Sequence, residues 1–256
     1  MENDEGRYVK QPDETVLCIL NVPFTTYTEN EVIARCTDYA MDQKPHVVIT
    51  AGPEFVMHAQ RDPTLLPLLE GADLITPDGI GIVLAARFHG HSDLERVTGV
   101  ALAEKLLAQS AARNFRVFLL GASPESNEKA LNAVRALYPE LVVSGRNGYF
   151  DATELPSILE QIRNFEPHIL LVGLGQPRQE RFIWEHRDAL SVPLMIGVGG
   201  TIDILAGTVK RAPALFQRMH LEWLYRLLTD PKRWRRQLAL PQFAYLAYQE
   251  RLRKGS

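Results

Sequence analysis

Short apolar runs alternate with longer amphipathic segments along the first two hundred residues of the chain. The apolar runs predict strands at 16–21, 46–50, 74–77, 116–120, 141–144, 169–173 and 193–198. The amphipathic segments predict helices at 29–41, 53–59, 65–70, 81–88, 101–113, 124–138, 154–165 and 178–189. Strand followed by helix at this spacing favours an α/β fold, in which helices cover both faces of a largely parallel sheet.

The pattern changes after residue 212, so we expect a body at 1–212 and a helical appendage at 213–256. In the appendage, Trp223 and Leu227 lie four residues apart, on one helix face, and Pro231 divides the segment into two helices. Aromatic and basic side chains together suit an anionic membrane surface, which predicts a membrane-associating appendage. The alternative is a helical hairpin that packs on the body.

Charge separates the same two parts. The net charge is −3, yet the stretch 210–256 holds eleven basic and three acidic side chains, so the remainder of the chain is acidic. A basic tail predicts a polyanionic partner, such as a phosphate group, an anionic membrane surface or a nucleic acid, although a solvated helix face is the alternative. The acidic body argues against a broad nucleic-acid footprint, and we expect no nucleic-acid partner.

Composition excludes several classes of protein. With 256 residues, 46% of them hydrophobic, the chain can bury a core. Cys18 and Cys36 form neither a disulfide framework nor a C-x-x-C site. The acidic start of the chain and the lack of an apolar run of about 20 residues predict a cytoplasmic protein. The histidines are scattered and no D-x-D pair ends a strand, so we expect no metal and no cofactor.

Glycines follow several of the predicted strands, and in a parallel sheet these turns meet at one edge, where ligands bind. Gly199 and Gly200 suit a cradle for a diphosphate or a sugar, and Gly121 with Ser123 suggests a second one. Neither G-x-G-x-x-G nor the P-loop pattern is present, which disfavours nicotinamide and P-loop nucleotide sites. The alternative is a set of tight turns that bind no ligand.

Three polar side chains at the same edge carry candidate chemistry. Asp78 follows a strand and can act as a general base, or it can cap the next helix. Arg96 can neutralise a developing charge, or it can form a surface salt bridge. Gln176 can donate and accept hydrogen bonds to a sugar, or it can be a solvated loop residue.

Six blocks of sequence together resemble the WecG/TagA/CpsF glycosyltransferases, glycosyltransferase family 26. The resemblance covers about 16–236 and rests on blocks at 74–79 (LITPDG), 96–99 (RVTG), 117–121 (VFLLG), 171–180 (LVGLGQPRQE), 197–203 (GVGGTID) and 222–236 (EWLYR and RWRR). It implies a Rossmann-like fold and an inverting transfer of a sugar, N-acetylmannosamine or a related hexose, from a UDP-sugar to a polyprenyl-diphosphate-linked sugar. The products are teichoic acid linkage units and other surface polysaccharides, made by a peripheral enzyme at the cytoplasmic face of the membrane.

The resemblance also implies roles for individual residues, with Asp78 as the base. Around the sugar it places Thr50, Arg96 and Gln176, and beside the uridine Asp203 and Tyr149. The arginines that close over the site from the appendage are Arg226, Arg233 and Arg236. One position departs from the family: many relatives have Thr-x-Asn-x-Glu where this chain has Gly52 in place of the asparagine, which leaves the identity of the sugar open. Whether the protein forms a homo-oligomer is also open.

Two alternatives belong to other functional classes. One is a nucleotide-binding oxidoreductase on the same kind of sheet, against which the missing glycine fingerprint argues. The other is a non-enzymatic protein that binds polyanions through its basic tail.

Overall fold

The protein is built around one six-stranded sheet, in which every pairing is parallel. A computed structural model describes residues 15–213, 215–216, 219, 221–229 and 238–254. The strands, in spatial order, are β4 (Leu74–Pro77), β3 (His46–Ala51), β8 (Leu194–Gly197), β7 (Ile169–Gly173), β5 (Val117–Gly121) and β6 (Val143–Arg146). The predicted α/β fold with a parallel sheet is therefore confirmed.

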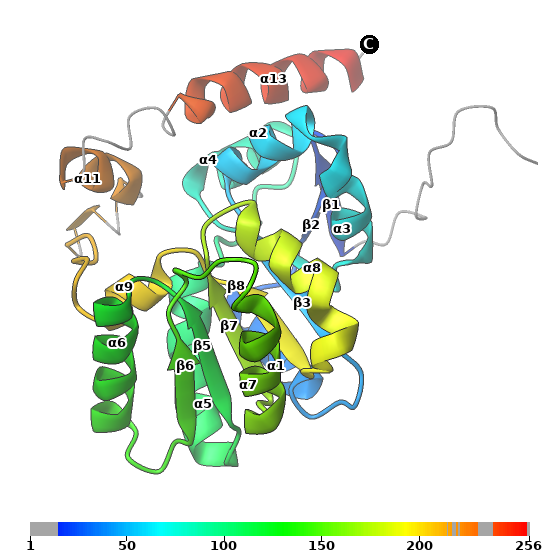
Figure 1. Ribbon diagram of the computed structural model, residues 1–256. Helices are drawn as coiled ribbons and strands as arrows, with labels where there is room; N and C mark the ends of the chain where they lie inside the picture. The colour runs from blue at the N-terminus through cyan, green and yellow to red at the C-terminus, as the bar shows by residue number, and fades with distance from the viewer. Residues whose placement is uncertain (1–14, 214, 217–218, 220, 230–237, 255–256) are drawn as a thin grey trace, which may run out of the picture.

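Helices cover both faces of this sheet (Figure 1), because successive side chains of a buried strand point into two different cores. In β5, Phe118 and Leu120 face one core, and Val117 and Leu119 face the other. The first core is covered by α2 (Pro53–Arg61), α3 (Leu66–Gly71), α4 (Ile80–Phe88), α7 (Leu155–Phe165) and α8 (Arg178–Leu190). The second is covered by α1 (Glu29–Tyr39), α5 (Gly99–Arg113), α6 (Pro124–Leu137) and α9 (Thr201–Leu205).

The first predicted strand is wrong in its extent. Residues 16–21 do not form one strand; β1 (Val16–Ile19) ends early and pairs antiparallel with β2 (Val22–Thr25) in a separate two-stranded sheet. Leu20 and Asn21 form the two-residue turn between them, with φ of 49° and 61°. Positive φ at both central residues is the turn geometry whose twist suits a hairpin.

The last described helix, α13 (Ala239–Lys254), packs on the body across α2 and α4 (Figure 1). Phe243, only 2% exposed, enters the same core as these helices, and the Leu20 backbone N–H donates to Glu250 Oε2 at 3.0 Å. Packing on the body, one of the two alternatives for the appendage, therefore describes α13. The described helix α11 covers Glu222–Thr229, and Pro231 lies outside the described residues. Within the described ranges, every helix falls short of the length and apolarity that crossing a bilayer demands.

Candidate active site

A cavity of about 270 Å³ opens where β3, β4, β7 and β8 end. Its walls include Thr50, Asp78, Arg96, Gln176, Gly199 and Gly200, all of which the sequence singled out. They meet because the carboxyl ends of parallel strands lie at one edge of the sheet. The helix α11 adds Glu222 and Trp223 to the wall, so the C-terminal part of the chain contributes to the same cavity.

Asp78 is held at the N-terminus of a helix other than the one that follows it. Its Oδ2 accepts a hydrogen bond of 3.0 Å from the backbone N–H of Gly99, the first residue of α5. The next helix, α4, is instead preceded by Gly79, which makes no side-chain capping bond. The alternative of Asp78 as a cap for α4 is therefore wrong. The bond from Gly99 and the positive end of α5 orient a carboxylate in the cavity wall, where it can accept a proton.

Gly52 allows the backbone that carries Asp78 to come close to β3. A Cβ atom at Gly52 would lie 2.6 Å from the carbonyl oxygen of Asp78, which is shorter than any normal contact. The Asp78 backbone N–H also donates to the Ala51 carbonyl at 3.0 Å. The glycine that departs from the family pattern thus fits the tight approach of the turns after β3 and β4.

Arg96 forms an ion pair inside the cavity wall. Its Nη2 lies 2.5 Å from Glu222 Oε2 of α11, and the two side chains are 17% and 16% exposed. The alternative role predicted for Arg96 was a surface salt bridge. Arg96 does form a salt bridge, but the pair lines the cavity and not the outer surface. An anionic ligand that binds Arg96 must share the guanidinium with Glu222 or displace it.

Gln176 and Thr50 are tied to the strands around them. The Gln176 Nε2 donates to the carbonyl oxygen of Thr50 at 2.8 Å, so the alternative of a solvated loop residue does not describe it. The Thr50 hydroxyl donates to the carbonyl oxygen of Gly197 at 2.8 Å. Because its hydrogen is used in this bond, the hydroxyl offers its lone pairs to a ligand.

The two predicted glycine cradles differ. Gly199 has a φ of +55°, and its N–H donates to Gln179 Oε1 at 3.0 Å in the cavity wall. Gly121 does not line the cavity; a Cβ atom there would lie 2.3 Å from the carbonyl oxygen of Gly173. The close approach of β5 to β7, together with a φ of +141°, accounts for the glycine at 121. Its assignment to a substrate cradle has no support in this geometry.

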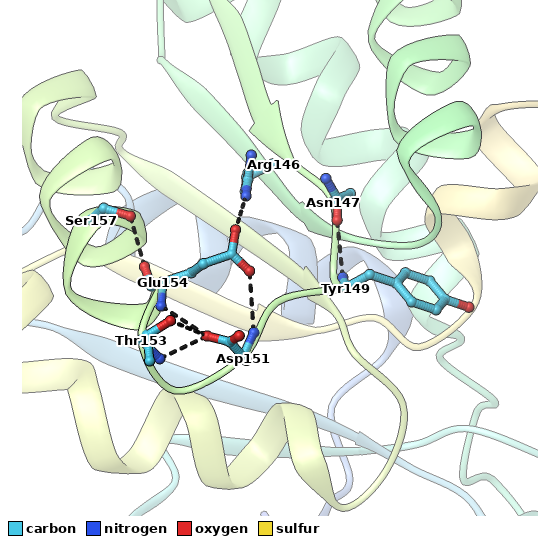
Figure 2. Close-up of polar contacts among 7 residues, drawn as sticks. All are labelled: Arg146, Asn147, Tyr149, Asp151, Thr153, Glu154 and Ser157. Carbon is cyan, nitrogen blue, oxygen red and sulfur yellow. Dashed lines mark hydrogen bonds and ion pairs between the residues drawn. The ribbon is translucent and has the colours of Figure 1, made fainter.

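Tyr149 and Asp203 also lie outside the cavity wall. Figure 2 shows the loop that carries Tyr149, between β6 and α7: Asp151 Oδ1 accepts from the Thr153 backbone N–H at 2.8 Å, and Arg146 pairs with Glu154 at 2.7 Å. The Tyr149 ring points away from this network and is 74% exposed. Hydrogen bonds within the loop hold it in place, and the Tyr149 ring is presented to solvent. The role of Tyr149 beside the uracil base stays a prediction.

Most of what was predicted for the appendage arginines falls outside the described residues. Arg226 belongs to α11, but its side chain lies outside the described residues, as do Arg233 and Arg236 altogether. Their closure over the site stays a prediction. Among the described residues, no group of three or more His, Cys, Asp or Glu side chains could hold a metal ion.

Sequence reasoning gave no site role to several residues that build or support the cavity, among them Gln179, Glu180, Arg211, Glu222 and Trp223. Gln179 and Glu180 lie in the first turn of α8, immediately after Gln176, and the sequence carries no signal that this turn is buried. Glu180 is 1% exposed, and burial raises the pKa of its carboxyl to about 7.

Comparison with known proteins agrees with this geometry. The model of the glycosyl transferase WecG/TagA/CpsF family matches residues 17–256. Three curated relatives share the name N-acetylglucosaminyldiphosphoundecaprenol N-acetyl-beta-D-mannosaminyltransferase. The protein of Bacillus spizizenii is 36% identical over 81% of this chain and 80% of its own, that of Bacillus subtilis is 32% identical over 92% of both, and that of Staphylococcus aureus is 33% identical over 89% and 90%. The oxidoreductase and polyanion-binding alternatives are therefore set aside, and the chain belongs to the WecG/TagA/CpsF family of glycosyltransferases.

Proposed function

We propose that the protein transfers N-acetylmannosamine from its UDP-activated form to N-acetylglucosamine carried on undecaprenyl diphosphate, for a teichoic acid or a related surface polymer. The names of the three relatives support this choice of sugar and acceptor. The observation that carries the mechanism is the meeting of a carboxylate, Asp78, and a guanidinium, Arg96, in one cavity at the ends of the strands.

The transfer is a single displacement that inverts the anomeric centre. The acceptor hydroxyl oxygen attacks the anomeric carbon as the bond from that carbon to the UDP oxygen breaks. The proton of the hydroxyl passes to Asp78, which the Gly99 N–H holds in place. Thr50 and Gln176, from the neighbouring turns, contact the sugar.

The leaving UDP gains negative charge, which this site meets with Arg96 and the N–H group of Gly200, because the Gly199 N–H already donates to Gln179. Arg226, Arg233 and Arg236 add bidentate guanidinium donors when the appendage closes. Arg96 then exchanges its partner Glu222 for a phosphate oxygen. Asp203 and Tyr149 bind the uridine, and no metal ion takes part, so activity persists in a chelator.

The lipid acceptor brings the reaction to the cytoplasmic face of the membrane, where the enzyme binds as a peripheral protein. The exposed basic side chains of α13, among them Arg251 and Arg253, support attraction to anionic lipid headgroups. Exposed Tyr245 and Tyr248 on the same helix suit the headgroup region.

The direct test compares two matched aspartates with UDP-N-acetylmannosamine and a soluble analogue of the lipid-linked acceptor. General-base help is typically worth about 10²–10⁴-fold, so Asp78→Asn lowers kcat by that factor and leaves UDP binding in calorimetry intact. Asp93→Asn changes an exposed aspartate outside the cavity and retains full activity. Wild-type turnover by Asp78→Asn removes Asp78 from the mechanism. Faster transfer from another UDP-sugar removes N-acetylmannosamine as the donor sugar.

A further inference from the structure

Glu180 is a buried carboxyl immediately behind the cavity. It lies in the first turn of α8 and is 1% exposed. No ion pair among the described residues includes it. Its Oε1 accepts two hydrogen bonds, at 2.8 Å from Gln179 Nε2 and at 3.2 Å from Gln176 Nε2, whereas its Oε2 has no partner among the described atoms. A buried carboxyl without a cation costs free energy, so its presence at this position calls for a reason other than stability.

The two amides that bind Glu180 lead to two turns of the cavity wall, which follow the neighbouring strands β3 and β8. Gln176 also donates to the Thr50 carbonyl at the end of β3, at 2.8 Å. Gln179 accepts from the Gly199 N–H in the turn after β8, at 3.0 Å. One carboxyl oxygen is thus the common point of two hydrogen-bond chains, each of which ends on backbone that lines the cavity.

The end of β8 is shaped to admit this network. A Cβ atom at Gly197 would lie 2.8 Å from Gln179 Nε2 and 3.2 Å from Glu180 Oε1. A glycine at 197 is therefore what allows the two side chains to reach their positions beneath the cavity floor.

We propose that Glu180 is a positioning residue for the transfer reaction, because through Gln176 and Gln179 it holds the turn at Thr50 and the turn at Gly199 in place beyond the point where β3 and β8 pair. This inference rests on the proposed function, in which the first turn contacts the sugar and the second contacts the diphosphate. The reacting atoms lie between the two turns, and misplacement by about 1 Å can cost about 10²-fold in rate.

The hydrogen-bonding capacity of a carboxyl oxygen explains why an acid can hold the two amides in place. A carboxyl oxygen can accept from both amides at once, and it does so in the ionised and in the protonated form. A glutamine at 180 keeps this acceptor oxygen at nearly the same place and volume, whereas a leucine removes it. Comparing these two substitutions therefore distinguishes the effect of the hydrogen-bond acceptor oxygen from the effect of the negative charge at position 180.

The experiment measures kcat and KM of Glu180→Leu and Glu180→Gln with the UDP-sugar and the acceptor analogue. We expect Glu180→Leu to lower kcat about 10- to 100-fold with its circular dichroism spectrum unchanged, and Glu180→Gln to stay within about threefold of wild type. Glu185→Leu, an exposed position on the same helix, serves as the matched control and keeps wild-type kcat. Wild-type kcat in folded Glu180→Leu overturns the proposal, as does an equal loss in Glu180→Gln.

Two further measurements keep the outcomes distinct. If Glu180→Leu does not fold, Glu180→Asp decides, since it keeps the acid but withdraws the acceptor oxygen from the two amides; a normal kcat then overturns the proposal. Gly197→Ala places a Cβ atom 2.8 Å from Gln179 Nε2, which displaces this amide, and is expected to lower kcat with Glu180 intact; an unchanged kcat counts against the proposal. Absence of transfer by the wild-type enzyme contradicts the proposed function instead, a result that the wild-type assay gives before any variant is made.

Discussion

The buried carboxyl of Glu180 makes a quantitative prediction about how stability depends on pH. Burial raises the pKa of this group from 4.5 to about 7 in the folded protein, whereas the unfolded chain returns it to its ordinary value. Between these two pH values the folded state therefore binds more protons than the unfolded state. The free energy of unfolding falls as pH rises through this window, because ionisation is easier in the unfolded chain.

The size of the effect follows from the two pKa values. Each pKa unit corresponds to about 1.4 kcal/mol, so Glu180 lowers the free energy of unfolding by about 3 kcal/mol between pH 4.5 and pH 7 and above. Roughly 2 kcal/mol of this decrease in the free energy of unfolding occurs between pH 5.5 and pH 8, a range in which unfolding can be measured. Glu180→Gln has no ionisable group and loses this component of the pH dependence.

Urea unfolding at pH 5.5, 6.5, 7.5 and 8 measures the difference between wild type and Glu180→Gln. Taking the difference removes the contributions of His46, whose pKa is raised by bonds to Asp42 and Asp73, and of the other groups common to both proteins. We expect the stability of Glu180→Gln relative to wild type to increase by roughly 2 kcal/mol from pH 5.5 to pH 8, at equal m-values. Two parallel curves would refute the reasoning, because they would mean that Glu180 titrates alike in both states.

Three further perturbations have defined outcomes. Phe243→Ala removes the largest side chain that α13 buries and is expected to lower the free energy of unfolding by about 3–5 kcal/mol, as measured by urea denaturation. Glu222→Gln removes the negative partner of the cavity arginine, so calorimetry should give an affinity for UDP about tenfold higher. Replacing Arg251, Arg253 and Lys254 together by Gln should weaken binding to anionic vesicles, measured by sedimentation, about 100-fold, since each charge contributes about 1 kcal/mol near such a surface.

Each of these predictions has a contrary result. An unchanged urea midpoint for Phe243→Ala would show that α13 does not contribute to the cooperative fold. Equal or weaker UDP binding by Glu222→Gln would mean that the ion pair supports the site rather than competing with the ligand. If the triple variant sedimented with anionic vesicles as well as wild type did, at low salt and with neutral vesicles as the control, these three charges would not contribute to membrane binding.

Much of the fold was predictable because buried parallel strands appear in the sequence as short, continuous apolar runs. The runs at 46–50, 117–121 and 169–173 are apolar on both faces, as expected when helices cover both sides of a sheet. The hairpin at the start of the body was not predictable in the same way. Its turn uses Leu20 and Asn21 without a glycine, so the predicted strand ran through the turn to residue 21, and β2 was not predicted.

The candidate site was predictable in its polar side chains and less so in its glycines. A glycine that admits a ligand and a glycine that admits a neighbouring strand have the same sequence signature, which is why Gly121 was grouped with Gly199. Glu180 escaped notice because an acid in the first turn of a helix ordinarily faces solvent near the positive end of the dipole. Only the packing of α8 against β3, β7 and β8 buries it.

The contact between α13 and the body has a consequence for biosynthesis. The apolar surfaces of α2 and α4 that receive Phe243 and Ala247 are translated long before the helix that covers them. On the ribosome, a nascent chain therefore presents this surface uncovered until residues 239–254 have emerged, and only then can Glu250 bond to the hairpin at Leu20. Termination of translation before residue 239 would release a chain with an open hydrophobic face, which makes it a substrate for chaperones and proteases.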